Sequence, residues 1–264
     1  MTGASPRIHV RRATKADADA ILDIHFAAFL PSATNRLMFP NGVTPDARVK
    51  FGQSLFPEEP ATGDGAAQKP SGDSGPETIV TVAELLPDSG TEGDAGEVIA
   101  FAKWVVYYEP RPREVWDAPR TPMTVETLGE GVNVDVYERF IGEVREMRKK
   151  WMKGEPGVLL DILASSPARG RMGAGSALLR WGLDFADQKG LDSWLESSPT
   201  GYPLYRRFGF EDVDVQDLPV TELWGVTRKS DEDWGSSTGL DVAGPLPEGA
   251  FRTVLMKRAA KKGK

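Results

Sequence analysis

The chain has 264 residues, of which 40% are hydrophobic, so it can form one sizeable core or two small ones. It contains no cysteine, which excludes disulfide bonds, thiolate zinc sites and a cysteine nucleophile. The formal net charge of -7 argues against a nucleic-acid-binding protein that depends on overall basic charge, and it favours a cationic or amine partner.

Apolar runs in the chain are short. Residues 1–12 lack the apolar region of a signal peptide, and no run of about 18 apolar residues occurs. We therefore expect a soluble intracellular protein in the cytoplasm, with the nucleus not excluded, and no contact with a membrane or with nucleic acid.

The first elements are a strand over residues 8–13 and a helix over 14–28. Thr14 is a suitable N-cap, Asp17 follows three residues later, and apolar residues then recur with helical spacing. A second short helix is expected over 48–56.

Residues 57–78 are rich in Pro, Gly, Ser, Asp and Glu and offer almost nothing to bury. We interpret them as a disordered insertion within a single domain over 1–264, because the strands that follow lack a core of their own. Residues 258–264 are expected to form a solvated basic tail.

β-Branched and aromatic residues predict strands over 78–86 and 98–107, joined as a hairpin by the polar loop 87–96. After a loop over 110–122, an amphipathic helix is predicted over 136–153. Its apolar residues recur every three or four positions: Val136, Phe140, Val144, Met147 and Trp151.

The nearly continuous apolar segment 158–164 is typical of a central strand that is buried on both faces. A Gly-rich turn, a helix over 176–189 and a strand over 191–196 follow it. A closing strand is expected over 251–257.

The Gly-rich turn over 169–176 combines three glycines with two flanking arginines, directly before a helix. Backbone N–H groups that converge at the positive end of a helix form a site for a pyrophosphate. The alternative is a tight connection whose glycines only permit positive φ. A Walker A loop is excluded because no lysine follows the glycines, and the spacing Gly170-x-x-Gly173-x-Gly175 does not fit a Rossmann fingerprint.

This turn resembles the acetyl-CoA loop of the GNAT superfamily of acetyltransferases, whose pattern is Arg/Gln-x-x-Gly-x-Gly/Ala after a central strand. Gly170 stands where the family has Arg or Gln, Arg169 lies one place early, and Met172 replaces a small or basic residue. The resemblance implies that the loop binds acetyl-CoA and leaves open which arginine meets it. The residues implied are Arg169, Gly170, Arg171, Met172, Gly173, Ala174, Gly175 and Ser176.

Residues 198–210 resemble the family's second signature, Asn-x-x-Ala-x-x-Leu-Tyr-x-x-x-Gly-Phe, at the expected distance from the loop. Ser198 stands in place of Asn and Gly201 in place of Ala, while the Leu-Tyr-x-x-x-Gly-Phe core is intact. Ser198 and Tyr205 are therefore added to the candidate cofactor contacts.

The resemblance implies an α/β (α+β) GNAT fold, with a central mixed, mostly antiparallel sheet flanked by helices and splayed central strands that hold acetyl-CoA. It implies an N-acetyltransferase that transfers acetyl to a primary amine by direct attack on the thioester. Two alternatives stay open: an acyltransferase with another acceptor or acyl-CoA, and a degenerate coenzyme A-binding regulatory protein.

Such a transfer needs a deprotonated amine, a donor to the thioester carbonyl and a proton for the thiolate. The resemblance places the donor at a backbone N–H where the central strand bulges, near Leu163, Ala164 and Ser165, and gives Tyr205 the role of general acid. The alternative for Tyr205 is a packing role. Asp161 or Glu196 could be the base, directly or through water, or could be paired structural groups.

The acceptor, a small molecule or a protein amine, would be selected by the first two helices and residues 110–134. No metal ion is expected in the site, and the sequence carries no sign of the oligomeric state. His25 is expected to be a satisfied helix residue, and core packing is preferred for Trp104, Trp116 and Trp151.

Overall fold

A computed structural model describes residues 7–56, 75–87 and 96–261. The strands are β1 (Ile8–Arg12), β2 (Glu77–Leu85), β3 (Glu97–Tyr107), β4 (Gly157–Ser165), β5 (Ser193–Ser197), β6 (Glu211–Leu218) and β7 (Phe251–Arg258). The α-helices are α1 (Ala18–Phe29), α2 (Ala33–Met38), α3 (Pro45–Leu55), α4 (Arg113–Trp116), α5 (Val125–Leu128), α6 (Val134–Met152), α7 (Ala174–Lys189), α8 (Tyr202–Arg207), α9 (Val220–Trp224) and α10 (Leu240–Ala243). Short 3₁₀ helices cover Lys15–Asp17 and Pro167–Arg169.

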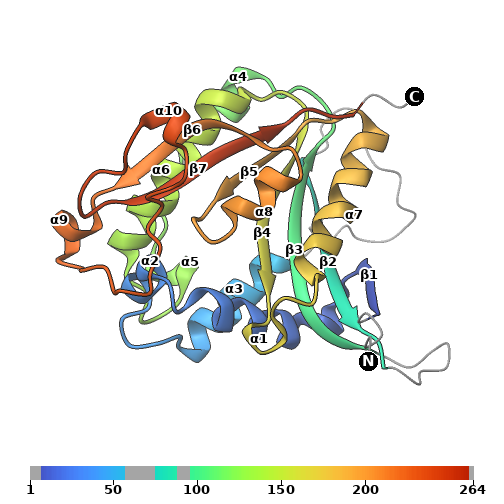
Figure 1. Ribbon diagram of the computed structural model, residues 1–264, viewed down its shortest axis with the longest axis horizontal. Coiled ribbons are helices and arrows are strands. Elements are labelled where there is room, and N and C mark those ends of the chain that lie inside the picture. The colour runs from blue at the N-terminus through green and yellow to red at the C-terminus, as the bar shows by residue number, and fades with distance from the viewer. Residues whose placement is uncertain (1–6, 57–74, 88–95, 262–264) are drawn as a thin grey trace.

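The strands form one sheet in the order β1-β2-β3-β4-β5-β7-β6 (Figure 1). Only β4 and β5 are parallel, and every other neighbouring pair is antiparallel. The mixed, mostly antiparallel sheet that the resemblance implied is therefore confirmed.

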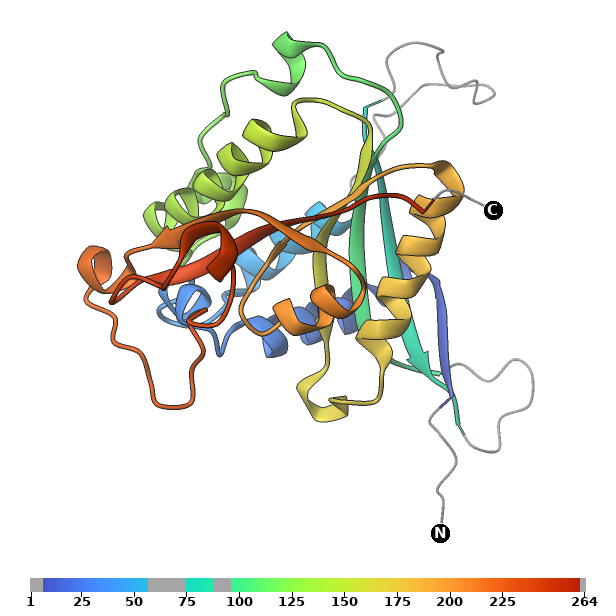
Figure 2. The same cartoon turned by 45° about the horizontal axis from the view of Figure 1, so that its top comes forward.

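Helices cover both faces of this sheet (Figure 2). On one face, α7 and α8 pack on the largest apolar cluster, which includes Leu178, Leu179 and Tyr205. On the other face, α1 and α3 cover β2 to β4, and α6 covers β4, β5 and β7 through Met147 and Met152. The parallel pair at the centre thus has α7 on one side and α6 on the other.

The close packing of α7 on the sheet depends on Gly182. A Cβ at this position would overlap the indole of Trp104, which is fully buried beneath the helix. The expected core role of Trp104 is confirmed. Trp151 is different: it is exposed on α6 and donates its indole N–H to Asp214 (2.7 Å), so its predicted place in the core was wrong.

The start of α1 follows the sequence prediction. Thr14 and Asp17 form a reciprocal capping box before the helix. Arg11 donates two hydrogen bonds of 2.8 Å to the Asp17 carboxylate, which fixes β1 to the first helical turn.

Two predicted boundaries need correction. The disordered insertion predicted over 57–78 lies mostly outside the described residues, and its last two residues already belong to β2. The hairpin loop 87–96 also lies mostly outside them. Arg258, predicted to begin a solvated tail, is buried at the end of β7 and donates to Asp187 (2.7 and 2.9 Å).

Strand β6 had no counterpart in the predicted elements. Acidic and apolar residues alternate over 212–215 of this strand, Glu211–Leu218, and it pairs along β7 at the edge of the sheet. Among the described residues, no helix is both long and apolar enough to span a membrane.

Candidate active site

The chain turns sharply between β4 and α7. Ser166 fixes the start of the turn by donating its backbone N–H to the Ile99 carbonyl (2.8 Å). Arg171 and Gly173 then adopt left-handed conformations, with φ of 65° and 89°, before α7 begins at Ala174. A non-glycine residue at positive φ is strained, and such strain is concentrated at ligand-binding and catalytic segments.

The backbone amides of this turn are free to bind a ligand. Those from Arg171 to Ser176 donate no hydrogen bond to any described residue, and the last three belong to the first turn of α7. Free amides at the positive end of a helix attract phosphate oxygens. The segment predicted from its glycines therefore has the physical properties of a pyrophosphate site.

The two arginines of the turn behave differently. Arg169 donates two hydrogen bonds to Glu97 at the start of β3 (3.0 and 2.7 Å), so its guanidinium is already occupied. Arg171 is exposed and forms no ion pair within the described part of the chain. Of the two, Arg171 is the arginine available to a phosphate.

β4 and β5 separate at the centre of the sheet. They pair only from Val158 to Leu160 on β4 and from Ser193 to Leu195 on β5, although β4 continues to Ser165. The splay predicted for the central strands is present next to the first turn of α7. A Cβ built on Gly175 would be in van der Waals contact with the Ser165 hydroxyl oxygen (3.4 Å), so the first turn of α7 lies directly beside the splayed part of β4.

β4 also has an irregularity against its other neighbour. The register against β3 shifts between Leu160 and Ile162, which leaves Asp161 as the extra residue. Leu163 to Ser165, the predicted position of the carbonyl donor, pair regularly with β3. Leu163, Ala164 and Ser165 still lie on the part of β4 that has parted from β5.

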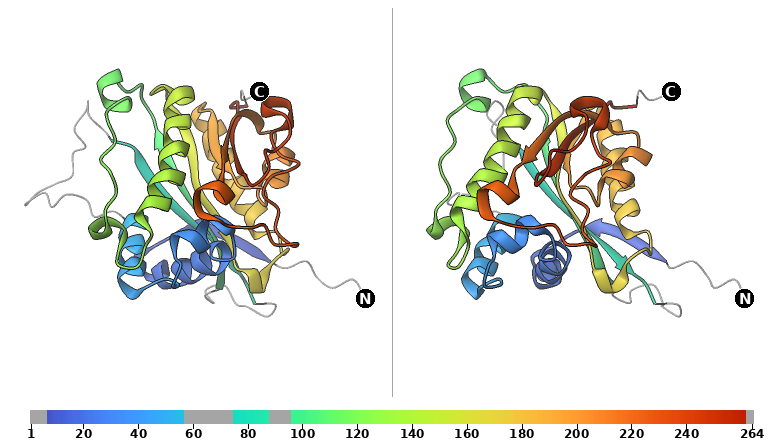
Figure 3. Two further views of the ribbon diagram at one scale, coloured as in Figure 1. Left: turned by 90° about the vertical axis from the view of Figure 1, so that its left-hand side faces the viewer. Right: turned by 60° about the vertical axis from the view of Figure 1, so that its left-hand side comes forward.

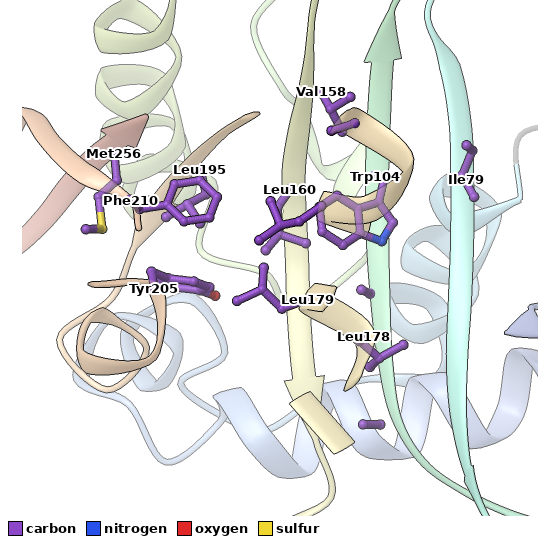
Figure 4. Packing of buried hydrophobic residues seen from close by; sticks show 14 of the residues in the cluster. Ile79, Trp104, Val158, Leu160, Leu178, Leu179, Leu195, Tyr205, Phe210 and Met256 are labelled. Atoms are coloured by element: carbon purple, nitrogen blue, oxygen red, sulfur yellow. The ribbon is translucent and has the colours of Figure 1, made fainter. Parts of the chain in front are cut away.

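Tyr205 lies on α8, on the same face of the sheet as α7 (Figure 4). Its phenol is directed toward Leu179 and β4 in this view, and its ring meets Phe210 edge to face with centroids 6.0 Å apart. Burial raises the pKa of Tyr205 well above its usual value, so the phenol keeps its proton at neutral pH.

Ser198 and Gly201 form the turn that carries Tyr205. The Ser198 hydroxyl accepts a hydrogen bond from the Gly201 amide (3.4 Å), so it holds the turn. A Cβ on Gly201 would come within 2.7 Å of the Tyr205 ring. This contact explains why glycine, and not the alanine of the family pattern, precedes this tyrosine.

The two candidate carboxylates lie on the opposite face, toward α6. Glu196 accepts two hydrogen bonds of 2.8 Å from Arg148 and its side chain is only 8% exposed. Asp161 lies 3.1 Å from Lys103 and 3.7 Å from Arg148, and its side chain is 27% exposed. Asp161 therefore has access to solvent, whereas Glu196 is enclosed in its ion pair.

The sequence did not single out Arg148 or Lys103. Arg148 lies on α6 and Lys103 on β3, far along the chain from either motif, and no local pattern links them to the carboxylates. His25 also departs from expectation: its Nδ1 is buried without a partner among the described residues, next to the Phe51 ring. Burial lowers the pKa of His25 to about 3.

Comparison with known proteins gives the fold. No model of a known protein family matches the chain. A crystal structure of mosquito arylalkylamine N-acetyltransferase like 5b superposes with a TM-score of 0.53 at 14% identity, covering 96% of this chain and all of that one. A Corynebacterium glutamicum structure, described as histone acetyltransferase HPA2 and related acetyltransferase, gives a TM-score of 0.47 at 18% identity over 97% and 98% of the two chains.

One sequence relative is also an acetyltransferase by name. A protein from Stachybotrys chartarum called "Acetyltransferase" is 26% identical over 152 residues, 54% of this chain. The chain matches only 60% of that protein's length. The protein described here thus has the fold of the GNAT acetyltransferases, and the resemblance drawn from its two motifs is confirmed at that level.

Proposed function

We propose that this chain is an N-acetyltransferase that uses acetyl-CoA and a primary amine. The proposal rests on one observation: the candidate cofactor-binding groups and the candidate base lie on opposite sides of the splayed strands. Free amides and the Tyr205 phenol lie on the α7 side, and Asp161 lies on the α6 side. This arrangement gives a cofactor and an amine separate approaches to one gap in the sheet.

The residues on the α7 side fit acetyl-CoA. Amides from Arg171 to Ser176, with the Arg171 side chain, would hold the pyrophosphate. Because the first turn of α7 lies directly beside the splayed part of β4, the rest of the cofactor would reach that part of the strand. When bound, acetyl-CoA supplies the acetyl group on a thioester that an amine can attack.

Each protein group then has one task in the transfer. A backbone N–H of β4 between Asp161 and Ser165, freed from pairing with β5, donates to the thioester carbonyl. Asp161 takes a proton from the amine, directly or through water, as the new C–N bond forms. Tyr205 gives its proton to the sulfur as the C–S bond breaks.

We assign Glu196 a structural role. A base must accept a proton, and both oxygens of Glu196 already accept hydrogen bonds from the Arg148 guanidinium. The Arg148–Glu196 pair holds α6 against β5 and places Arg148 beside Asp161. Glu196 is therefore a positioning residue in this proposal.

The acceptor class draws support from one relative. The mosquito structure is described as an arylalkylamine N-acetyltransferase-like protein, and this chain shares its fold over nearly its full length. A primary amine is therefore the first acceptor class to test.

The test combines binding with turnover. Isothermal titration should show that acetyl-CoA binds, and a thiol-release assay should show coenzyme A production that depends on an added amine. Binding without amine-dependent release for any amine in a broad panel would contradict the enzymatic proposal and indicate a coenzyme A-binding regulatory protein. Absence of binding would contradict the cofactor assignment itself.

A further inference from the structure

The connection between β6 and β7 is unusually long for neighbouring antiparallel strands. The pair is in register up to Leu218 and Phe251, and a hairpin at this point needs about two to five residues. Instead, residues 219–250 form this connection, and its helices are the short α9 and α10. Long ordered loops of this kind usually have a function. We call residues 219–250 the β6–β7 loop.

Arg252 anchors the returning half of this loop. Its guanidinium is fully buried and donates to both oxygens of Asp217 on β6 (2.6 Å each). It also donates to the carbonyls of Thr238 and Gly244 (3.0 and 2.7 Å), which belong to the loop. A buried arginine with its donors satisfied holds a loop in one conformation.

The other half of the loop is attached to α2 and α6. Glu232 lies 2.6 Å from the Arg36 guanidinium on α2, and the Trp234 indole donates to Glu232 (3.0 Å). Trp234 is buried in an apolar cluster with Ala33 of α2, against which Phe140 of α6 also packs. The loop therefore bridges the edge of the sheet and the N-terminal helices.

The loop also reaches the turn in front of Tyr205. A Cβ on Gly235 would lie 3.4 Å from the Pro199 ring, which follows directly after Ser198. In Figures 1 and 3 the segment after α9 runs past α2 and then returns to α10. It thus spans from α2 to the β5–α8 turn.

This placement bears on how an acceptor enters. With acetyl-CoA on the α7 side, the amine must approach from the side of α1, α2 and α6. The β6–β7 loop is attached to α2 by the Arg36–Glu232 pair and lies beside the far wall of that approach at Pro199. An extended peptide would need an open path between these two walls, whereas a small amine would not.

We infer that the β6–β7 loop closes the acceptor side of the site, so that the acceptor is a small free amine and not an amine on a polypeptide. This inference rests on the proposed acetyltransferase function and adds the class of acceptor. The loop is a specificity-determining element, and Arg36 and Glu232 are its positioning residues.

The test compares a set of small primary amines with unstructured peptides that carry an N-terminal or lysine amine. The enzymes are the wild type, Glu232→Gln and Arg36→Gln, with Glu222→Gln as control for an exposed glutamate of the same loop. We expect kcat/KM of the wild type to be at least about 10²-fold higher for small amines than for peptides, because the closed loop weakens peptide binding.

Breaking the Arg36–Glu232 pair should release the loop. Both variants should raise the peptide to small-amine ratio of kcat/KM by about threefold or more, the scale of one partly buried ion pair. Hydrogen exchange over residues 226–239 should accelerate in the same variants, while the Kd for acetyl-CoA and the ratio in Glu222→Gln stay at wild-type values.

Two results would overturn the inference. One is a wild type that acetylates peptides as efficiently as small amines while the loop amides stay protected from exchange. The other is faster exchange in Glu232→Gln and Arg36→Gln with no change in the acceptor ratio. Coenzyme A release that no amine accelerates would instead refute the acetyltransferase proposal, so the two failures are distinguishable.

Discussion

Gly175 gives the sharpest test of the cofactor loop, because Gly175→Asp should change folding and binding in opposite directions. Gly175 is the second residue of α7, and its backbone lies outside the positive-φ residues. Replacing glycine by aspartate inside a helix gains only about 0.3 kcal/mol of helix propensity, because aspartate ranks just above glycine. An aspartate in the first turn also gains about 0.3 to 1 kcal/mol from the helix dipole. The variant should therefore unfold about 1 to 4 °C higher than the wild type without ligand.

The same carboxylate should prevent cofactor binding. Two unit charges about 4 Å apart repel by about 4 kcal/mol near a protein surface, so Kd for acetyl-CoA should rise at least about 10²-fold. Isothermal titration measures this Kd, and scanning calorimetry measures the melting temperature. Gly175→Asn is the matched control, since it adds the same bulk without the charge and should bind more tightly than the Asp variant. Gly173→Asp is less suitable, because φ of 89° makes any side chain there costly to folding.

Acetyl-CoA binding by Gly175→Asp within about threefold of the wild type would refute the loop assignment. A melting temperature below that of the wild type would contradict the expected gain in stability and would attribute the loss of binding to unfolding.

Three other residues give independent tests. Tyr205→Phe should lower kcat by about 10²-fold or more with little change in Kd for acetyl-CoA. Since burial raises the pKa of Tyr205, the alkaline limb of the enzyme's pH–rate profile should lie above about pH 10, and it should vanish in Tyr205→Phe. Unchanged turnover in Tyr205→Phe would indicate that water, and not Tyr205, is the acid. Glu196→Gln should lower the free energy of unfolding by about 3 kcal/mol, because it leaves Arg148 without its partner. The kcat of the folded variant should stay within about tenfold of the wild-type value, and a loss of about 10²-fold would make Glu196 the base. Hydrogen bonds from Arg11 lower the pKa of Asp17 to about 2. Its ionised carboxylate therefore stabilises the fold by about 2 kcal/mol above about pH 4, and this contribution is lost as the pH falls from 4 to 2. Urea unfolding between pH 6 and 2 should show a flatter profile for Asp17→Asn, and an equal slope in both proteins would contradict this role.

The parts of the fold that local pattern determines could be predicted from the sequence. The strand, Gly-rich turn and helix around residues 158–189 follow from an apolar run, positive-φ positions and helical spacing, all of which act over a few residues. The capping box at Thr14 and Asp17 is equally local. The two motifs then placed these elements in a known fold, because their order and spacing are specific.

The features that depend on distant partners could not be predicted. The bulge falls at Asp161 because β4 must adjust its register to β3, and a single strand carries no sign of where that adjustment occurs. Arg169 fits a phosphate site by its position, yet Glu97, from another strand, neutralises it. Trp151 continues the apolar spacing of α6, but Asp214 of β6, a strand absent from the predicted elements, holds it at the surface.

Hydrogen exchange with and without acetyl-CoA tests the central assignment most directly, because it locates the ligand without requiring turnover. Binding should slow exchange over residues 170–177 and over the splayed ends of β4 and β5, with smaller changes at α8. A depression at the C-terminal end of α6, lined by Trp151, Trp194 and Lys257 among others, serves as the internal comparison. Hydrogen exchange of the residues around it should not change on binding. Protection centred on that depression, or saturation with acetyl-CoA that leaves residues 170–177 unchanged, would contradict a cofactor site at the start of α7.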